Sequence, residues 1–127
     1  MGHEEHDRRI DYIELAVADV ARAKAFYTSV FGWKTTDWGD EYASFEDGRI
    51  GGGFAKAGNA PTSAGGPLVI LYSTDLEAIE KAVRDAGGAI VKEIFPFPGG
   101  RRFHFADPDG YVLAVWSDRD ANGATIG

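Results

Sequence analysis

The chain has 127 residues, of which 44% are hydrophobic and 26% are charged, a balance typical of one globular domain rather than of a disordered chain. The formal net charge of −7 argues against binding to nucleic acid or anionic membranes, because both need clustered lysine and arginine. The absence of cysteine excludes disulfides and thiolate metal sites.

Residues 1–9 are expected to form a flexible N-terminal segment. Within it, His3 and His6 flank two glutamates, and a mobile segment explains them better than a metal site does. These residues lack the apolar stretch of a signal peptide, and no apolar run in the chain approaches the length of a membrane span. We therefore expect a cytoplasmic protein with no membrane partner.

A first structural unit is expected at about residues 10–56. It opens with apolar residues that alternate at strand periodicity, namely Ile13, Leu15 and Val17. Asp19 then stands where a side chain can cap a helix, the helix is expected over Val20–Phe31, and Gly32 is its stop. Three strand-like runs follow, with turn pairs between them. The runs are Trp33–Trp38, Glu41–Glu46 and Gly51–Lys56, and the turn pairs are Gly39-Asp40 and Asp47-Gly48.

The same order of features returns 56 residues later, after a linker at 57–67 that is rich in glycine, alanine, serine and proline. Asp75 is again the candidate cap, and the helix is expected over Leu76–Ala86 with Gly88 as its stop. The second unit spans about 68–117. Its further strands are expected at Ala89–Phe95, Arg101–Ala106 and Tyr111–Trp116, with turns at 96–100 and 107–110.

The repeat predicts an α+β fold made of two tandem βαβββ modules. Each half alone would bury too little surface to be stable, so we expect a single domain over residues 10–117. Residues 118–127 then form a C-terminal tail.

Two strings within these modules are specific. They are DVARAKAFYTSVFGW (Asp19–Trp33) and FADPDGYVLAVW (Phe105–Trp116). Together with the duplicated unit, they resemble the glyoxalase/bleomycin-resistance/extradiol dioxygenase (vicinal oxygen chelate) superfamily over about residues 10–117. The resemblance implies a glyoxalase-like fold, in which the strands curve around a cleft and the helices pack outside, and it also implies a homodimer.

In the metal enzymes of this family, the resemblance implies one ligand from the first and one from the last strand of each module. Carried onto this sequence by the local strings, the four positions are Tyr12, Gly52, Leu68 and Ala114. A divalent metal needs lone pairs on nitrogen or oxygen, and the last three side chains offer none. We therefore expect no metal and no other cofactor, although glyoxalase, extradiol dioxygenase and fosfomycin-modifying activities depend on that metal.

Strand alternation predicts what the cleft contains instead. If Tyr12 faces the cleft, Glu14 and Ala16 face it too, and the alternate residues pack under the helix. This lining is mostly apolar and aromatic, which suits a small organic ligand with one or two polar handles. In the second module, the same rule selects Leu68, Ile70, Tyr72, Val112, Ala114 and Trp116.

Two titratable residues are candidates for catalysis. Glu14 could be a general base whose pKa is raised by apolar neighbours, or a carboxylate satisfied by an arginine, a tyrosine hydroxyl or backbone N–H groups. His104 lies between Phe103 and Phe105, which point to the other face of its strand. It could act with Glu14 as an acid or base, or it could be a packed, hydrogen-bonded residue.

Other residues leave alternatives open. Arg101 and Arg102 could bind an anionic substrate bidentately or lie solvated at the surface. Trp33 and Trp38 could stack on a planar ligand, fill the core or lie at a subunit interface. The three consecutive glycines at 51–53 favour a bulge or a close backbone approach to a ligand, and no helix signal follows them as a phosphate-binding loop would require.

Two functions are consistent with these patterns. The first is a metal-free, glyoxalase-like domain that binds a small molecule in its cleft, as drug-sequestering relatives do. The second is a metal-independent isomerase or lyase that uses Glu14 with Tyr12, Tyr72 or His104. A metal-dependent lyase or dioxygenase comes third. We also expect a homodimer, since one small core cannot absorb all the aromatic residues.

Overall fold

The computed structural model describes residues 7–57 and 67–126. Within these ranges, two helices and eight strands follow one another as two βαβββ modules, so the predicted tandem fold is confirmed. The first module contains β1 (Tyr12–Val17), α1 (Val20–Phe31), β2 (Lys34–Asp37), β3 (Tyr42–Glu46) and β4 (Gly51–Lys56). The second contains β5 (Ile70–Tyr72), α2 (Leu76–Asp85), β6 (Ala89–Phe97), β7 (Gly100–Ala106) and β8 (Val112–Ser117).

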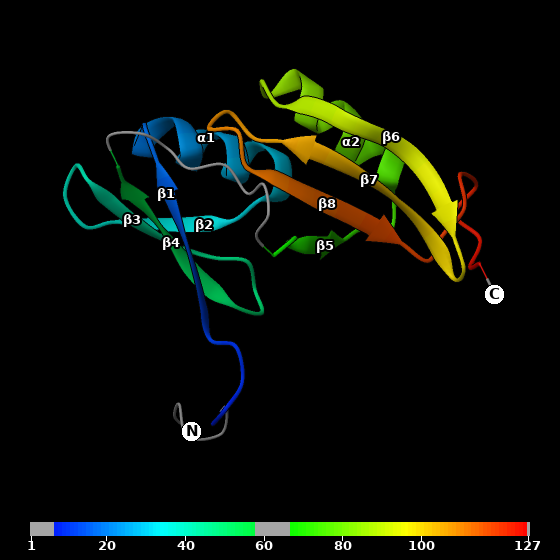
Figure 1. The fold of residues 1–127 in the computed structure, drawn as a ribbon, viewed down its shortest axis with the longest axis horizontal. Coiled ribbons are helices and arrows are strands. Elements are labelled where there is room, and N and C mark those ends of the chain that lie inside the picture. The colour runs from blue at the N-terminus through cyan, green and yellow to red at the C-terminus, as the bar shows by residue number, and fades with distance from the viewer. Residues whose placement is uncertain (1–6, 58–66, 127) are drawn as a thin grey trace.

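Each module forms its own four-stranded sheet. The strand order is β1-β4-β3-β2 in the first sheet and β5-β8-β7-β6 in the second, and Figure 1 shows the two side by side. In each sheet the first strand pairs in parallel with the last, while the other pairs are antiparallel. Both sheets therefore have the same topology, as the 56-residue repeat predicts.

The first helix begins and ends where its sequence signals lie. The carboxylate of Asp19 accepts a hydrogen bond from the backbone N–H of Arg22 at 3.0 Å, and Gly32 ends the helix in the left-handed region at φ 71°. Asp75 caps the second helix in the same way, through the N–H of Ala78 at 3.1 Å. These caps are local, so the sequence places them well.

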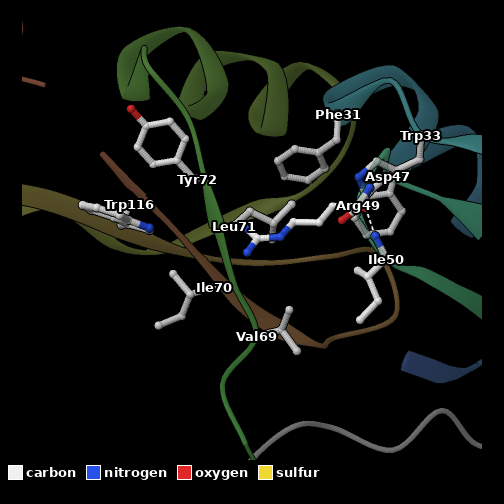
Figure 2. A pocket seen from close by; sticks show the side chains of 10 residues that line it. All are labelled: Phe31, Trp33, Asp47, Arg49, Ile50, Val69, Ile70, Leu71, Tyr72 and Trp116. Atoms are coloured by element: carbon white, nitrogen blue, oxygen red, sulfur yellow. Dashed lines mark hydrogen bonds between the residues drawn. The ribbon is translucent and has the colours of Figure 1, made fainter. Parts of the chain in front are cut away.

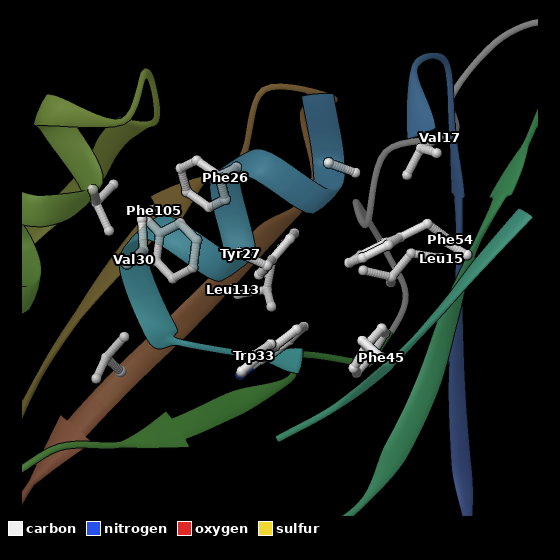
Figure 3. Packing of buried hydrophobic residues seen from close by; sticks show 14 of the residues in the cluster. Leu15, Val17, Phe26, Tyr27, Val30, Trp33, Phe45, Phe54, Phe105 and Leu113 are labelled. Atoms are coloured by element: carbon white, nitrogen blue, oxygen red, sulfur yellow. The ribbon is translucent and has the colours of Figure 1, made fainter. Parts of the chain in front are cut away.

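The hydrophobic core lies around α1 and joins the two modules (Figure 3). Tyr27 stacks on Trp33 with ring centroids 4.6 Å apart, and the Trp33 and Phe45 ring centroids are 4.3 Å apart. Of the alternatives for Trp33, the structure therefore shows a place in the core. Phe26, also in α1, packs near Phe105 of the second sheet, with ring centroids 6.1 Å apart. Each sheet thus has an inner face turned to this core and an outer face turned away from it.

A buried joint connects the two sequence strings that carry the family resemblance. The hydroxyl of Tyr27 in α1 donates to Asp107 Oδ2 at 2.6 Å, and Asp107 Oδ1 accepts the backbone N–H groups of Asp109 and Tyr111, both at 2.9 Å. The Tyr111 hydroxyl in turn accepts the N–H of Ala16 in β1 at 3.0 Å. Burial raises the pKa of Asp107, and the hydrogen bond from Tyr27 opposes that shift. The turn before β8 therefore fixes the second module onto the first.

Two expectations about local geometry are wrong. The second helix ends through Gly87, whose φ is +94°, whereas Gly88 packs its backbone against Val83 and the carbonyl of Ala106. β6 runs through the expected turn as far as Phe97, because two register shifts keep it paired with β7.

Gly52, one of the four positions carried over from the family resemblance, points to the inner face. A Cβ there would lie 2.2 Å from both the Ile13 carbonyl oxygen and the Phe45 ring.

The expected N-terminal segment, with His3 and His6, and most of the expected linker lie outside the described residues. The described part of the tail folds back on itself, since Arg119 bridges Thr125 and the N–H of Ile126 donates to the Asp118 carbonyl at 2.6 Å. Within residues 7–57 and 67–126, neither helix has the length and apolar character needed to cross a membrane.

Candidate functional site

The outer face of the first sheet carries Tyr12 and Glu14, as strand alternation predicts. Leu15 and Val17 are buried in the core, while Tyr12 is 46% exposed and Glu14 is exposed. The Glu14 carboxylate is therefore not enclosed by apolar neighbours. Its partner is a tyrosine hydroxyl, one of the alternatives left open by the sequence.

That partner is Tyr42, a residue which sequence reasoning missed. The Tyr42 hydroxyl donates to Glu14 Oε1 at 3.0 Å and lies 2.5 Å from the Tyr12 hydroxyl. Burial raises the pKa of Tyr42, and its hydrogen bonds to Tyr12 and Glu14 raise it further. Both rings cross over Gly53, where a Cβ would lie 2.0 Å from the Tyr42 oxygen. The missing side chain of Gly53 therefore leaves room for the Tyr12 and Tyr42 rings rather than for a ligand. The antiparallel pairing of β3 with β4 is the signal that could have identified Tyr42.

The outer face of the second sheet gathers most of the other predicted residues. In one row across the strands, Ile70 lies beside Ala114, and Ala114 lies beside His104. In the next row, Tyr72 lies beside Trp116, and Trp116 lies beside Arg102. Ala114 is fully buried, whereas Leu68, Ile70 and Tyr72 are 37%, 44% and 48% exposed.

Two hollows adjoin this face. The larger, of about 450 Å³, sits between the edge strand β5 and the turn joining β3 to β4 (Figure 2), and residues on both faces of β5 line it. In that turn Asp47 accepts the N–H groups of Arg49 and Ile50 at 2.8 and 2.7 Å, which presents both residues to the hollow. The predicted turn Asp47-Gly48 marked this place, but its approach to the second module was not predicted. The lining residues are Phe31, Trp33, Asp47, Arg49, Ile50, Val69, Ile70, Leu71, Tyr72 and Trp116.

The smaller hollow, of about 340 Å³, is lined by Ile70, Phe97, Arg102 and Trp116. It adjoins the larger one, because Ile70 and Trp116 line both. Trp116 contacts the Tyr72 ring edge-on at 5.2 Å and the Phe97 ring at 6.3 Å. Phe97 was expected in a turn, so its place in the hollow depends on the longer course of β6.

Polar atoms without partners lie on the same face. Arg102 Nε and His104 Nε2 are buried, and neither has a hydrogen-bond partner among the described residues. Burial lowers the pKa of His104, and the neighbouring charges of Arg102 and Lys92 lower it further. Phe103 and Phe105 are fully buried on the inner face, as expected from alternation.

The structure separates the two candidate catalytic residues. Glu14 lies on the first sheet and His104 on the second, and in the described part of the chain no hydrogen bond or ion pair joins them. Neither Tyr12 nor Glu14 lines the two hollows. A joint acid–base role for Glu14 and His104 therefore has no support from the geometry of one chain.

Arg101 and Trp38 have local roles. The guanidinium of Arg101 forms two hydrogen bonds with the Glu77 carboxylate, at 2.7 and 3.3 Å, and a third with the Arg119 carbonyl at 3.0 Å. Arg101 therefore ties β7 to α2 and to the C-terminal tail. Trp38 is 66% exposed, and its indole N–H donates to Ser44 Oγ at 2.9 Å.

The metal that the family resemblance implies does not fit the donors present. Of its four positions, Gly52 points into the core, Leu68 and Ala114 have no donor atom in their side chains, and the Tyr12 hydroxyl is engaged by Tyr42. Among residues 7–57 and 67–126, no three His, Cys, Asp or Glu side chains are grouped as a metal site would require. These four positions therefore do not form a site for a divalent metal.

The chain is similar to proteins of known sequence and structure. It is 31% identical to the anthracycline biosynthesis proteins DauV of Streptomyces sp. (strain C5) and DnrV of Streptomyces peucetius, over 91% of this chain and 49% of each relative. The chain thus spans about half the length of these curated relatives. Its fold matches the solved structure of protein SA1046 from S. aureus, with a TM-score of 0.73 and 19% identity over 87% of this chain and 98% of the other.

A family model matches most of the chain. The model of the Glyoxalase/Bleomycin resistance protein/Dioxygenase superfamily matches residues 9–115, which include the first sequence string, the first module and nearly all of the second string and module. The chain belongs to the Glyoxalase/Bleomycin resistance protein/Dioxygenase superfamily.

Proposed function

We propose that this protein binds a small organic molecule beside β5 and β8 of its second sheet, in the two adjoining hollows. The observation that carries the proposal is that the two hollows are continuous, since Ile70 and Trp116 line both of them. Small-molecule sites combine apolar and aromatic walls with a few polar groups that orient the ligand. Tyr72 and Trp116 supply aromatic walls here, and Arg49 and Arg102 supply polar groups, one in each hollow.

The relatives support an aromatic ligand. DauV and DnrV are named as anthracycline biosynthesis proteins, and anthracyclines are planar, multi-ring aromatic molecules. A planar ring system suits the aromatic lining, because aromatic faces and edges attract one another at ring separations of about 4.5–7 Å. We therefore propose a planar aromatic ligand rather than a flexible aliphatic one.

Replacing Trp116 by alanine should weaken the binding of a planar arene by roughly tenfold or more, because burial against a large aromatic side chain contributes about 1.5–3 kcal/mol. The measurement is a calorimetric titration with a neutral dihydroxyanthraquinone. Trp38→Ala is the matched control, since Trp38 is exposed and lines neither hollow. If the parent protein does not bind this arene, or if both variants bind it equally well, the proposed hollow is not the site.

We further propose that two copies associate through the apolar outer faces. Ile10 and Tyr12 at the first sheet and Ile70 and Tyr72 at the second are between 44% and 81% exposed, and exposed apolar side chains of this size are typical of an interface. A second copy seated there would also close the hollows against water. Sedimentation equilibrium at micromolar concentration should give about twice the 13.7 kDa mass of the chain. A purely monomeric species would reject the dimer and leave the binding proposal in place.

A second candidate function is a metal-independent isomerase or lyase, and the contact between Tyr42 and Glu14 favours it. A carboxylate held by one tyrosine hydroxyl, with a second tyrosine beside it, offers a proton acceptor next to two proton donors. These three groups lie on the first sheet, away from the proposed hollows, so this candidate is tested separately.

A further inference from the structure

The outer face of the second sheet carries two cations that form no ion pair among the described residues. Arg102 is half-buried on β7, its Nε is buried without a partner, and no ion pair in the described part of the chain involves it. Lys92 lies on the adjacent strand, with its ammonium 4.2 Å from the Phe95 ring centroid. These two side chains therefore place positive charge on one face of a chain whose net charge is −7.

Aromatic rings surround this arginine. Its guanidinium carbon lies 5.5 Å from the Phe95 ring centroid and 5.9 Å from that of Phe97, within the range of cation–π attraction. The Phe97 ring is also close to Trp116, so the arginine stands at one end of a hollow with aromatic walls. These rings restrict the guanidinium, which reduces the entropy lost when it binds a ligand.

The Nε–H of Arg102, which has no partner among the described residues, favours a ligand that carries negative charge. A half-buried cation with an unsatisfied N–H has lost part of its hydration, and an anion on the ligand would offset that loss. Arginine recognises planar carboxylates through two parallel hydrogen bonds. The remaining lining groups, Ile70, Phe97 and Trp116, are apolar or aromatic and suit a ring.

We propose that the smaller hollow binds a planar aromatic anion, with a carboxylate on Arg102 and the ring system against the side chains of Phe97 and Trp116. This inference rests on the proposed function, which it narrows from planar arenes to anionic ones.

The test compares three arenes of one shape and different charge: naphthoate, naphthamide and naphthylmethylammonium. Each is titrated against the full chain and followed by the NMR shifts of the backbone amides. Naphthoate should bind roughly tenfold or more tightly than naphthamide, because a hydrogen bond to a charged group contributes about 1.5–3 kcal/mol. Naphthylmethylammonium should bind the most weakly of the three, and the naphthoate shifts should map to β7 and β8.

Arg102→Gln removes the charge and keeps a hydrogen-bonding side chain, so it should abolish the preference for naphthoate over naphthamide. Arg102→Lys should retain only part of it, because an ammonium cannot form the paired hydrogen bonds. Arg84→Gln is the matched control: Arg84 lies on α2, pairs with Glu80 and lines neither hollow, so the preference should be unchanged. The NMR spectra of all variants also report whether they fold.

Equal binding of naphthoate and naphthamide, or a preference that survives in Arg102→Gln, would overturn the inference and leave the proposed arene site standing. If the neutral anthraquinone also fails to bind, the proposed function itself is lost. If the anthraquinone binds but no naphthalene derivative does at millimolar concentration, the anion inference alone is wrong.

Discussion

Gly52→Ala should destabilise the fold by about 3 kcal/mol or more, the largest stability loss that we expect from so small a change. The added Cβ would lie 2.2 Å from the Ile13 carbonyl oxygen and 2.2 Å from Phe45 Cζ. The first contact is with backbone inside the β1–β4 pair, and the second is with a ring stacked on Trp33 in the core. Neither neighbour can move without breaking other packing, so the strand must shift.

Gly51→Ala is the matched control for this experiment. It adds the same methyl group one residue earlier in β4, where the nearest atoms are Phe45 O at 3.5 Å and Tyr12 Cδ1 at 3.9 Å. These are ordinary contacts, and alanine also restricts the unfolded chain, so the stability should change by no more than about 1 kcal/mol. Urea unfolding should therefore give a much lower midpoint for Gly52→Ala alone. Equal midpoints would mean that β4 does not run as closely to β1 as described.

Glu14→Gln should reduce any turnover by about 10²–10⁴-fold if Glu14 is a general base, because a positioned base contributes rate acceleration of that size. An isomerase or lyase of this type would remove a proton next to a carbonyl group. The reaction can be followed by NMR as exchange of that proton for solvent deuterium in a panel of small ketones and oxo acids. The amide preserves the shape of the side chain and the contact with Tyr42, so binding should change less than exchange.

Glu46→Gln is the control for this prediction, since Glu46 is an exposed carboxylate on β3 whose strand partner, Gly51, also pairs with Tyr12. It should leave exchange unchanged. If the parent protein catalyses no exchange with any compound, the isomerase or lyase candidate is lost. If exchange occurs and Glu14→Gln retains it, then Glu14 is not the base and its contact with Tyr42 is structural.

Local signals explain what the sequence determined by itself. The cap at Asp19, the apolar stripe and the stop at Gly32 all lie within one short segment, and they predicted α1 at its observed bounds. Strand alternation placed Leu15 and Val17 inside and Tyr12 and Glu14 outside, because successive side chains in a strand point to opposite faces. The repeat of these signals was enough to predict the tandem fold.

Strand pairing and the contacts between modules decided which side chains meet in the candidate sites. Gly52 faces the core and Tyr42 reaches Glu14 because β4 pairs with β1 on one side and β3 on the other, and no local pattern fixes that register. Likewise, Phe97 meets Trp116 and Arg102 only because β6 continues through two register shifts.

The buried joint shows the same division. The sequence marks the helix with Tyr27 and the turn with Asp107 as two separate strings, 80 residues apart. Only the tertiary structure brings the hydroxyl to the carboxylate, at 2.6 Å. Periodicity and capping act over a few residues and can be read along the chain, whereas a buried hydrogen bond depends on how whole elements pack. The sequence by itself therefore determined the elements and the faces they present, and the packing of the two modules decided which residues meet.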